Sequence, residues 1–133
     1  MNRIALILRA RGLGGFLTAV PALRALREAL PRHEFVLATP LSLLPVVRLS
    51  GCADRVLHTP DVRLLHSGGV IPGIAVDMQG EGPLSQRALR SLRPGRLVAF
   101  GRPEVGSPGP RWVEQEHEVH RWCRLVESSF AVR

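Results

Sequence analysis

Short, continuously apolar segments alternate along this chain with segments whose apolar residues recur every three or four positions. Residues 4–8 (IALIL) are apolar throughout, which is typical of a strand buried on both faces of a parallel sheet. Residues 34–38, 55–58, 74–77 and 96–100 predict four further strands. Helices are expected between them, so the order predicts a Rossmann-like three-layer α/β sandwich with a parallel sheet and right-handed crossovers.

The segments between the strands have the periodicity of amphipathic helices. Thr18 is expected to act as the N-cap of the first helix, which places Pro21 in its first turn, and Pro31 ends it. Three further helices are expected: residues 41–49, interrupted by Pro45; Leu84 or Ser85 to about Leu92; and Glu114 to about Phe130. The last of these aligns one apolar face, made of Val119, Trp122, Cys123, Val126 and Phe130.

A glycine-rich turn, with Gly12, Gly14 and Gly15, follows the first predicted strand. Such a turn brings backbone N–H groups and a helix N-terminus up to an anionic ligand, or it simply permits tight packing of strand against helix. A dinucleotide fingerprint would need a glycine where Leu17 stands, and no GK[ST] sequence of a Walker A loop follows. A ligand-facing turn is the favoured interpretation, and tight packing is the alternative.

A second turn of the same kind follows the fourth predicted strand, at Asp77-Met78-Gln79-Gly80. It is expected beside the first turn, at the same edge of the sheet. Asp77 is a candidate general base, but an acidic residue at a strand end more often caps a neighbouring loop or helix. The capping interpretation is favoured.

The composition predicts one globular domain, since 133 residues with 45% apolar and 22% charged residues can form a packed core. All 18 basic residues are Arg and the net charge is +7, which favours anionic partners. No nucleic-acid partner is expected, because aromatic and basic residues do not interleave and no nucleic-acid motif is present.

Cys52 and Cys123 are isolated, as in reduced cytoplasmic proteins, so a cytoplasmic location is expected, including a peripheral position at the inner membrane face.

Each of two charged clusters can be interpreted either as a binding site or as a solvent-exposed surface. Arginines recur every third residue from Arg87 to Arg96, which suggests either a phosphate-binding stripe or a solvated helix face. The solvated face is favoured, because a three-residue spacing drifts around a helix. The side chains of Glu114, Glu116, His117, Glu118 and His120 could bind a metal, but their spacing lacks the HExxH arrangement, and a solvated first helical turn is expected. Neither a metal nor a cofactor is expected.

Three motifs, in order, resemble the N-terminal half of glycosyltransferase family 9, the heptosyltransferases, which transfer sugars from ADP-activated donors to lipopolysaccharide core and related glycans. These motifs are Gly14-x6-Pro21-Ala22-Leu23, Asp77-x-Gln79-Gly80 and His117-x-Val119-x-Arg121. The resemblance implies a GT-B fold, in which two Rossmann-like domains face each other across a cleft. The N-terminal domain supplies the acceptor side, and the C-terminal domain binds the nucleotide sugar.

The resemblance makes residues 1–133 a single acceptor-side domain, with the donor-binding domain absent and a homodimer expected through the exposed interdomain face. It implies an acceptor-binding set of Arg9, Arg11, Gly12, Gly14, Gly15, Gln79 and Gly80. The family places its proposed general base, an Asp, where this chain has Gly15, and glycine has no side chain to accept a proton. Sugar transfer by this chain alone is therefore not expected. The alternative is a non-catalytic module that binds an anionic glycan or lipid head group.

Overall fold

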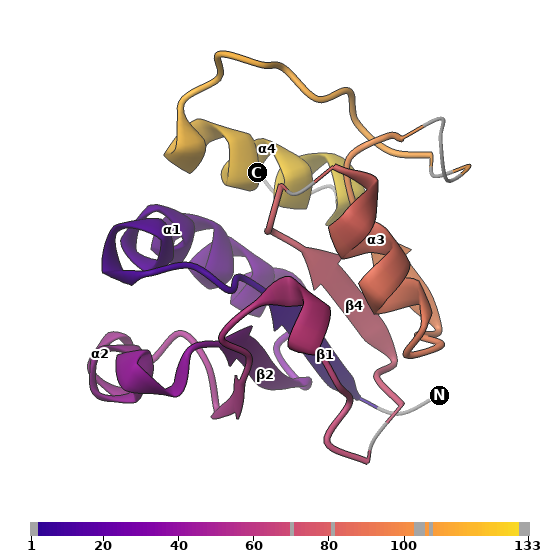
Figure 1. Ribbon diagram of the computed structural model, residues 1–133. Coiled ribbons are helices and arrows are strands. Elements are labelled where there is room, and N and C mark those ends of the chain that lie inside the picture. The colour runs from indigo at the N-terminus through magenta and orange to yellow at the C-terminus, as the bar shows by residue number, and fades with distance from the viewer. Residues whose placement is uncertain (1–2, 70, 81, 103–105, 107, 131–133) are drawn as a thin grey trace.

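The computed structural model describes residues 3–69, 71–80, 82–102, 106 and 108–130, which form one parallel sheet with helices on both faces (Figure 1). The five strands lie in the order β3-β2-β1-β4-β5 and all neighbours pair in parallel. Their bounds are Ile4–Leu8 for β1, Glu34–Thr39 for β2, Arg55–His58 for β3, Ile74–Asp77 for β4 and Arg96–Val98 for β5. The predicted α/β class and all five strands are confirmed, although β5 ends two residues early.

The remaining elements are four α-helices and two short 3₁₀ helices within the described residues. Their bounds are Leu13–Ala29 for α1, Leu44–Ser50 for α2, Pro83–Arg90 for α3, Glu118–Phe130 for α4, Leu41–Leu43 for η1 and Val62–Leu64 for η2. In the part of the chain that the structure describes, no helix is long and apolar enough to cross a membrane.

Alternate residues of the strands enter two separate apolar cores, one on each face of the sheet. Ile7 and Phe35 belong to the core under α1, α2 and α4, whereas Leu6 and Val36 belong to the core under α3 and η2. Both neighbours of β1 are strands, so Leu6 pairs in register with Val36 on one side and with Ala75 on the other. This double coverage explains why the strand segments are apolar at every position.

Helix α1 begins at Leu13, so the prediction of Thr18 as its N-cap was wrong. Gly14 and Gly15 lie in the first helical turn rather than in an open loop. The early start follows from packing, because Phe16 is completely buried in the core beneath α1. Pro21 consequently lies inside the helix, where it removes one backbone hydrogen bond.

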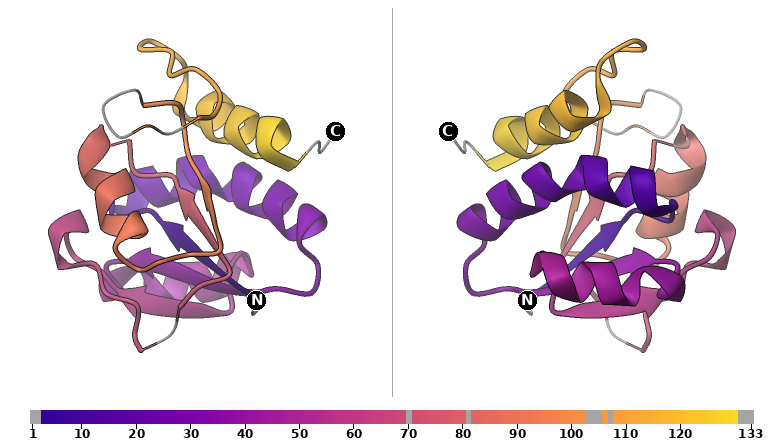
Figure 2. Two further views of the ribbon diagram at one scale, coloured as in Figure 1. Left: turned by 90° about the vertical axis from the view of Figure 1, so that its right-hand side faces the viewer. Right: turned by 90° about the vertical axis from the view of Figure 1, so that its left-hand side faces the viewer.

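Helix α4 begins at Glu118, four residues later than expected, and lies alongside α1 in both views of Figure 2. Residues 114 and 115 form a turn before the helix, and the ring Nδ1 of His117 accepts the backbone N–H of Val119 at 3.2 Å at the helix start. The buried face of α4 includes Leu125, which the predicted face lacked, and Val119 and Cys123 are only partly buried.

Candidate functional site

The two glycine turns meet where the order of the sheet reverses, between β1 and β4. In open parallel sheets this reversal point is where ligands bind, beyond the carboxyl ends of the strands. The Gln79 side chain joins the two turns, since its Oε1 accepts the backbone N–H of Ala10 at 2.6 Å and its Nε2 donates to the Ala10 carbonyl at 3.3 Å. Gln79 is buried, so this amide pair positions one turn against the other.

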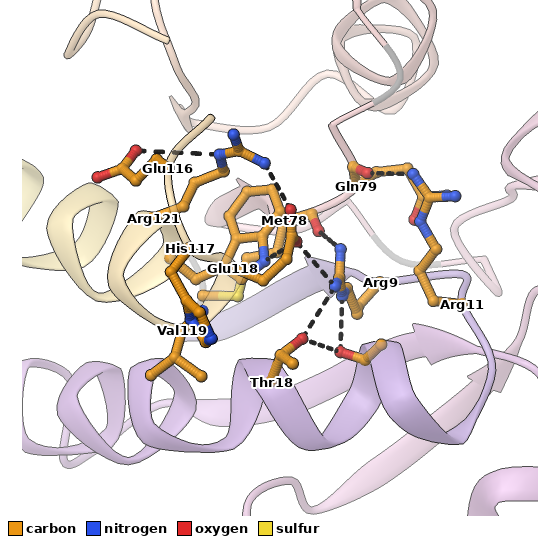
Figure 3. A network of polar contacts seen from close by, with 12 residues as sticks. Arg9, Arg11, Thr18, Met78, Gln79, Glu116, His117, Glu118, Val119 and Arg121 are labelled. Atoms are coloured by element: carbon orange, nitrogen blue, oxygen red, sulfur yellow. Dashed lines mark hydrogen bonds and ion pairs between the residues drawn. The ribbon is translucent and has the colours of Figure 1, made fainter. Parts of the chain in front are cut away.

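Arg9 lies at the centre of the network in Figure 3, with only 3% of its surface exposed. Its Nε donates to the Gly15 carbonyl at 3.0 Å, and one terminal nitrogen donates to the Met78 carbonyl at 2.8 Å. The other terminal nitrogen donates to the hydroxyl of Thr18 at 3.2 Å and to the carboxylate of Glu118 at 3.3 Å. These contacts connect the end of β1 to α1, β4 and α4, which gives Arg9 a structural role.

Arg11, Gly12 and Gly14 form the exposed rim of the first turn. A Cβ atom added to either glycine would meet no atom within 4 Å, so both glycines face open space. The guanidinium of Arg11 donates to the Gln79 carbonyl at 2.9 Å and crosses from the first turn to the second. Gly80 has a φ of +74°, which side chains rarely adopt, and a Cβ there would approach the Trp112 ring at 3.0 Å.

Gly15, where the family resemblance would place a general base, has no room for a side chain. A Cβ atom built on Gly15 would overlap the Cβ of Arg11 and lie 3.1 Å from its Cγ. The stem of Arg11 therefore fills the volume in which a carboxylate at position 15 would begin. The two positions are sterically coupled, and a single substitution to Asp does not restore the family arrangement.

Asp77 is buried and serves the turn that follows β4, as the capping interpretation predicted. Its carboxylate accepts the hydroxyl of Ser85 at 2.6 Å and the backbone N–H of Gln79 at 2.9 Å. Burial raises the pKa of Asp77 above its ordinary value, and the hydrogen bonds from Ser85 and Gln79 only partly oppose this effect.

The third motif of the sequence holds α4 and its preceding turn together (Figure 3). Arg121 is buried and donates to the carbonyls of Val113 and Glu114 at 2.6 and 3.1 Å, and to the carboxylate of Glu118. Glu116 accepts from Arg124 at 2.7 Å, and this hydrogen bond lowers the pKa of Glu116. Among the described residues, no group of three or more His, Cys, Asp or Glu side chains could hold a metal ion.

The arginines from Arg87 to Arg96 are exposed, which agrees with the favoured interpretation of a solvated face. Arg96 folds back onto α4, where it donates to the Ser129 carbonyl at 2.6 Å and stacks on the Phe130 ring at 4.6 Å. These exposed side chains are not part of the network around Arg9.

Sequence reasoning missed the residues that complete the site from α1 and α4. Thr18 was assigned to a helix cap, and Glu118 to a solvated helical turn. The Trp122 ring lies under the Arg9 guanidinium at 5.0 Å, and its Nε1 donates to Glu118 at 2.9 Å. No local signal marks Glu118 and Trp122, because their contacts with Arg9 span more than 100 positions of the chain. Thr18 is only nine positions from Arg9, but its hydroxyl was predicted to cap the helix instead.

Solved structures of glycosyltransferases contain the same arrangement of elements. E. coli heptosyltransferase WaaC with ADP matches with a TM-score of 0.74 and 18% identity, over 98% of this chain and 48% of that one. The glycosyl transferase family 9 protein from Veillonella parvula DSM 2008 matches with a TM-score of 0.73 and 11% identity, over 100% of this chain and 43% of that one. The chain has the fold of these enzymes. It spans about half of their length.

A third match, to WaaC with ADP-2-deoxy-2-fluoro heptose, has a TM-score of 0.71 and 16% identity, over 98% of this chain and 49% of that one. No protein-family model matches the sequence, and no curated protein sequence matches it significantly. The likeness therefore establishes the fold, and function has to be argued from the site.

Replacing Arg9 by Met is expected to lower the free energy of unfolding by about 3 kcal/mol, because the buried Met78 carbonyl would lose its donor and Glu118 would lose an ion-pair partner. Urea denaturation followed by circular dichroism measures this change. Arg24→Met, on the exposed side of α1, serves as the matched control and should stay within about 0.5 kcal/mol of the original protein. Equal stability of the two variants would contradict the structural role of Arg9.

Gly15→Asp is expected to destabilise the protein by about 1–3 kcal/mol, because the new side chain overlaps the stem of Arg11. Arg11→Gly, which removes the Cβ and Cγ atoms that the new side chain meets, should remove most of that penalty, so a double-mutant cycle should show a coupling well above experimental error. Gly14→Asp is the control, since it adds the same charge to the same helical turn at a position with open space. Strictly additive effects of the substitutions at positions 11 and 15 would contradict the steric coupling.

Asp77→Asn is expected to flatten part of the pH dependence of stability. Because the folded state raises the pKa of Asp77, this carboxyl contributes stability at low pH that is lost as the pH rises through the folded pKa. In urea denaturation, the stability of the variant relative to the original protein should therefore increase as the pH rises above the ordinary Asp pKa of about 4. Glu127→Gln, on the exposed face of α4, should not reproduce this trend.

Proposed function

We propose that this chain is the acceptor-side domain of a family 9 glycosyltransferase, which presents a glycan or lipopolysaccharide-like acceptor to a sugar on a nucleotide donor. One observation carries the proposal. Gln79 of the second motif and Arg121 of the third lie far apart in the sequence, yet both belong to one polar network, built around Arg9 and Glu118, at the reversal point of the sheet. Gln79 joins the two turns, and Arg9 ties both turns to α4 through Glu118. The heptosyltransferase fold of the chain supports the same conclusion.

The proposed acceptor-binding surface is the exposed rim of the first turn. Arg11 supplies a positive charge there, while Gly12 and Gly14 allow an acceptor to approach the backbone. Gly80 shapes the adjoining turn, and Arg9, Gln79 and Gly15 support the rim from beneath. On this proposal the domain acts in the cytoplasm at the inner membrane face, where it meets a lipid-linked acceptor.

Among the described residues, the carboxylates near this surface already accept hydrogen bonds from other parts of the chain. Asp77 is buried against Ser85 and Gln79, and Glu118 accepts from Arg9 and Trp122. With Gly15 at the base position, the chain contributes acceptor binding and orientation rather than proton transfer. Turnover is not proposed for this chain alone.

Exposed apolar side chains around the same edge suit an interface with a second domain or a second copy of the chain. Leu13 and Leu17 project from the first turns of α1, and Leu41 and Leu84 follow the ends of β2 and β4. Each is between 41% and 51% exposed. Large exposed leucines at one edge of a sheet are typical of a surface that is covered in the assembled protein.

A non-catalytic module for anionic glycans or lipid head groups is the second candidate. It is supported by the net charge of +7, the exposed Arg11 and the glycine at the base position. The two candidates differ in the ligand that they accept. An acceptor domain should prefer a glycan whose accepting hydroxyl is free, whereas a binding module should bind the glycan equally well after the next sugar has been added.

The test is binding of this chain to immobilised lipopolysaccharide-core glycolipid at low and moderate salt. Binding should weaken about tenfold with Arg11→Ala, since a charge-assisted contact is worth about 1.4 kcal/mol. Arg24→Ala, which removes an exposed arginine elsewhere on α1, is the control and should leave binding unchanged. If Arg11→Ala and Arg24→Ala weakened binding equally, the interaction would depend on the net charge of the chain and not on Arg11. Clear sugar transfer by the chain alone would overturn the assignment of a non-catalytic half.

A further inference from the structure

Strand β5 forms one edge of the sheet, and a groove lies along its outer side. β5 pairs only with β4. The groove has a volume of about 510 Å³ and is lined by residues 96–99, by residues 108–110, and by Ser128 and Ser129 at the end of α4. Successive side chains of a strand point to opposite faces, so four consecutive residues line one groove through their backbone edge. The groove therefore presents the main chain of β5.

The hydrogen bonds of β5 show which backbone groups face the groove. The N–H of Arg96 donates at 2.9 Å to the carbonyl of the residue before β4. Because bonding directions alternate along a strand, the N–H and C=O of Leu97 and the N–H of Ala99 point the other way. The next outward N–H, that of Gly101, already donates to the Pro110 carbonyl at 2.8 Å. Among the residues that the structure describes, none pairs with the outward groups of Leu97.

Gly109 determines the direction in which another strand can pair here. It lies so close to the Ala99 carbonyl oxygen that a Cβ atom on Gly109 would overlap that oxygen. An antiparallel neighbour that bonds to Ala99 would need this oxygen as an acceptor, whereas a parallel neighbour needs only the Ala99 N–H and the two groups of Leu97. The available groups therefore match a strand parallel to β5, like every other pair in the sheet.

The surroundings of β5 define the side chains of such a strand. Leu97 packs against the core on the α3 face of the sheet, and Val98 belongs to the core on the α1 face. A further strand would extend both cores, so it is expected to be apolar at consecutive positions. Arg93 and Arg96 are exposed around the start of β5, and the described residues that line the groove include no acid. Acidic residues at the start of the further strand would complement this charge.

We propose that the β5 edge binds an extended segment of a partner polypeptide, which runs parallel to β5, begins with acidic residues and continues with apolar ones. In strand addition of this kind, main-chain hydrogen bonds supply affinity and alternate side chains supply specificity. The proposal does not rest on the proposed function, because it uses neither the glycine turns nor the network around Arg9. Loss of glycolipid binding would leave it unchanged.

The test is an NMR titration of the full, isotopically labelled chain with the peptide acetyl-Asp-Glu-Val-Val-Ile-Val-Thr-Ser-amide. Hydrogen exchange at the amides of Leu97 and Ala99 should slow by about tenfold at saturation, because both N–H groups become bonded. The control is the same peptide with its four apolar residues N-methylated, which keeps the side chains and charges but removes donors, and it should not protect these amides. Unchanged exchange at millimolar peptide, or equal protection by both peptides, would contradict the proposal.

The direction of the bound strand has its own measurement. A nitroxide label at the amino end of the peptide should broaden the amide resonance of Arg96 more than that of Gly101, since parallel strands begin at the same end. The reverse order of broadening would exclude a parallel strand. Protection of Leu97 and Ala99 that rises with protein concentration in the absence of peptide would identify a second copy of the chain as the occupant, against the proposal.

Two pairs of variants separate main-chain bonding from charge. Leu97→Pro removes the outward N–H, a change that edge strands tolerate, and should weaken peptide binding about tenfold relative to Leu97→Ala, which also shortens the side chain but keeps the N–H. Equal affinities of these two variants would count against strand addition. Arg96→Gln should reduce the salt dependence of binding, whereas Arg87→Gln, at an exposed arginine of α3 outside the groove, should not. This second pair keeps the proposal testable if Leu97→Pro does not fold.

Discussion

The burial of one guanidinium organises the functional edge of this domain. Arg9 leaves the end of β1 and reaches carbonyls from α1 and from the turn after β4, a hydroxyl of α1 and a carboxylate of α4. Burial lowers the pKa of Arg9, and Glu118 opposes that effect. A charge taken out of water requires nearly every donor to be paired, so each segment around Arg9 has little freedom to move.

This constraint changes the interpretation of the motifs that suggested a glycosyltransferase. In the sequence Gln79 is a predicted acceptor-binding residue, Asp77 a candidate base with capping as the favoured role, and Arg121 a motif residue, and each hydrogen-bonds to nearby backbone. They build the edge on which an acceptor would lie. The groups that remain accessible to a ligand are the Arg11 side chain and the backbone at Gly12 and Gly14 in the first turn.

Arg11 and Gly15 are sterically coupled. The Cβ and Cγ atoms of Arg11 lie where a side chain at position 15 would begin, so the first turn has a cation at its rim and no carboxylate beneath it. This coupling joins two residues only four positions apart, where the chain turns from β1 into α1.

The sequence by itself determined the strands and the places of the two turns, because continuous apolar runs and glycines reflect local physics that each segment obeys independently. It also supported the capping role of Asp77, which depends on residues within eight positions. Tertiary structure alone decided where α1 begins, since burial of Phe16 outweighed the apparent cap at Thr18. It also decided that Arg9 is interior, because Arg9 contacts Met78 and Glu118, which lie 69 and 109 positions away. The lack of space at Gly15 comes from Arg11, four residues earlier, and depends on the backbone path between them, which residue types alone do not reveal.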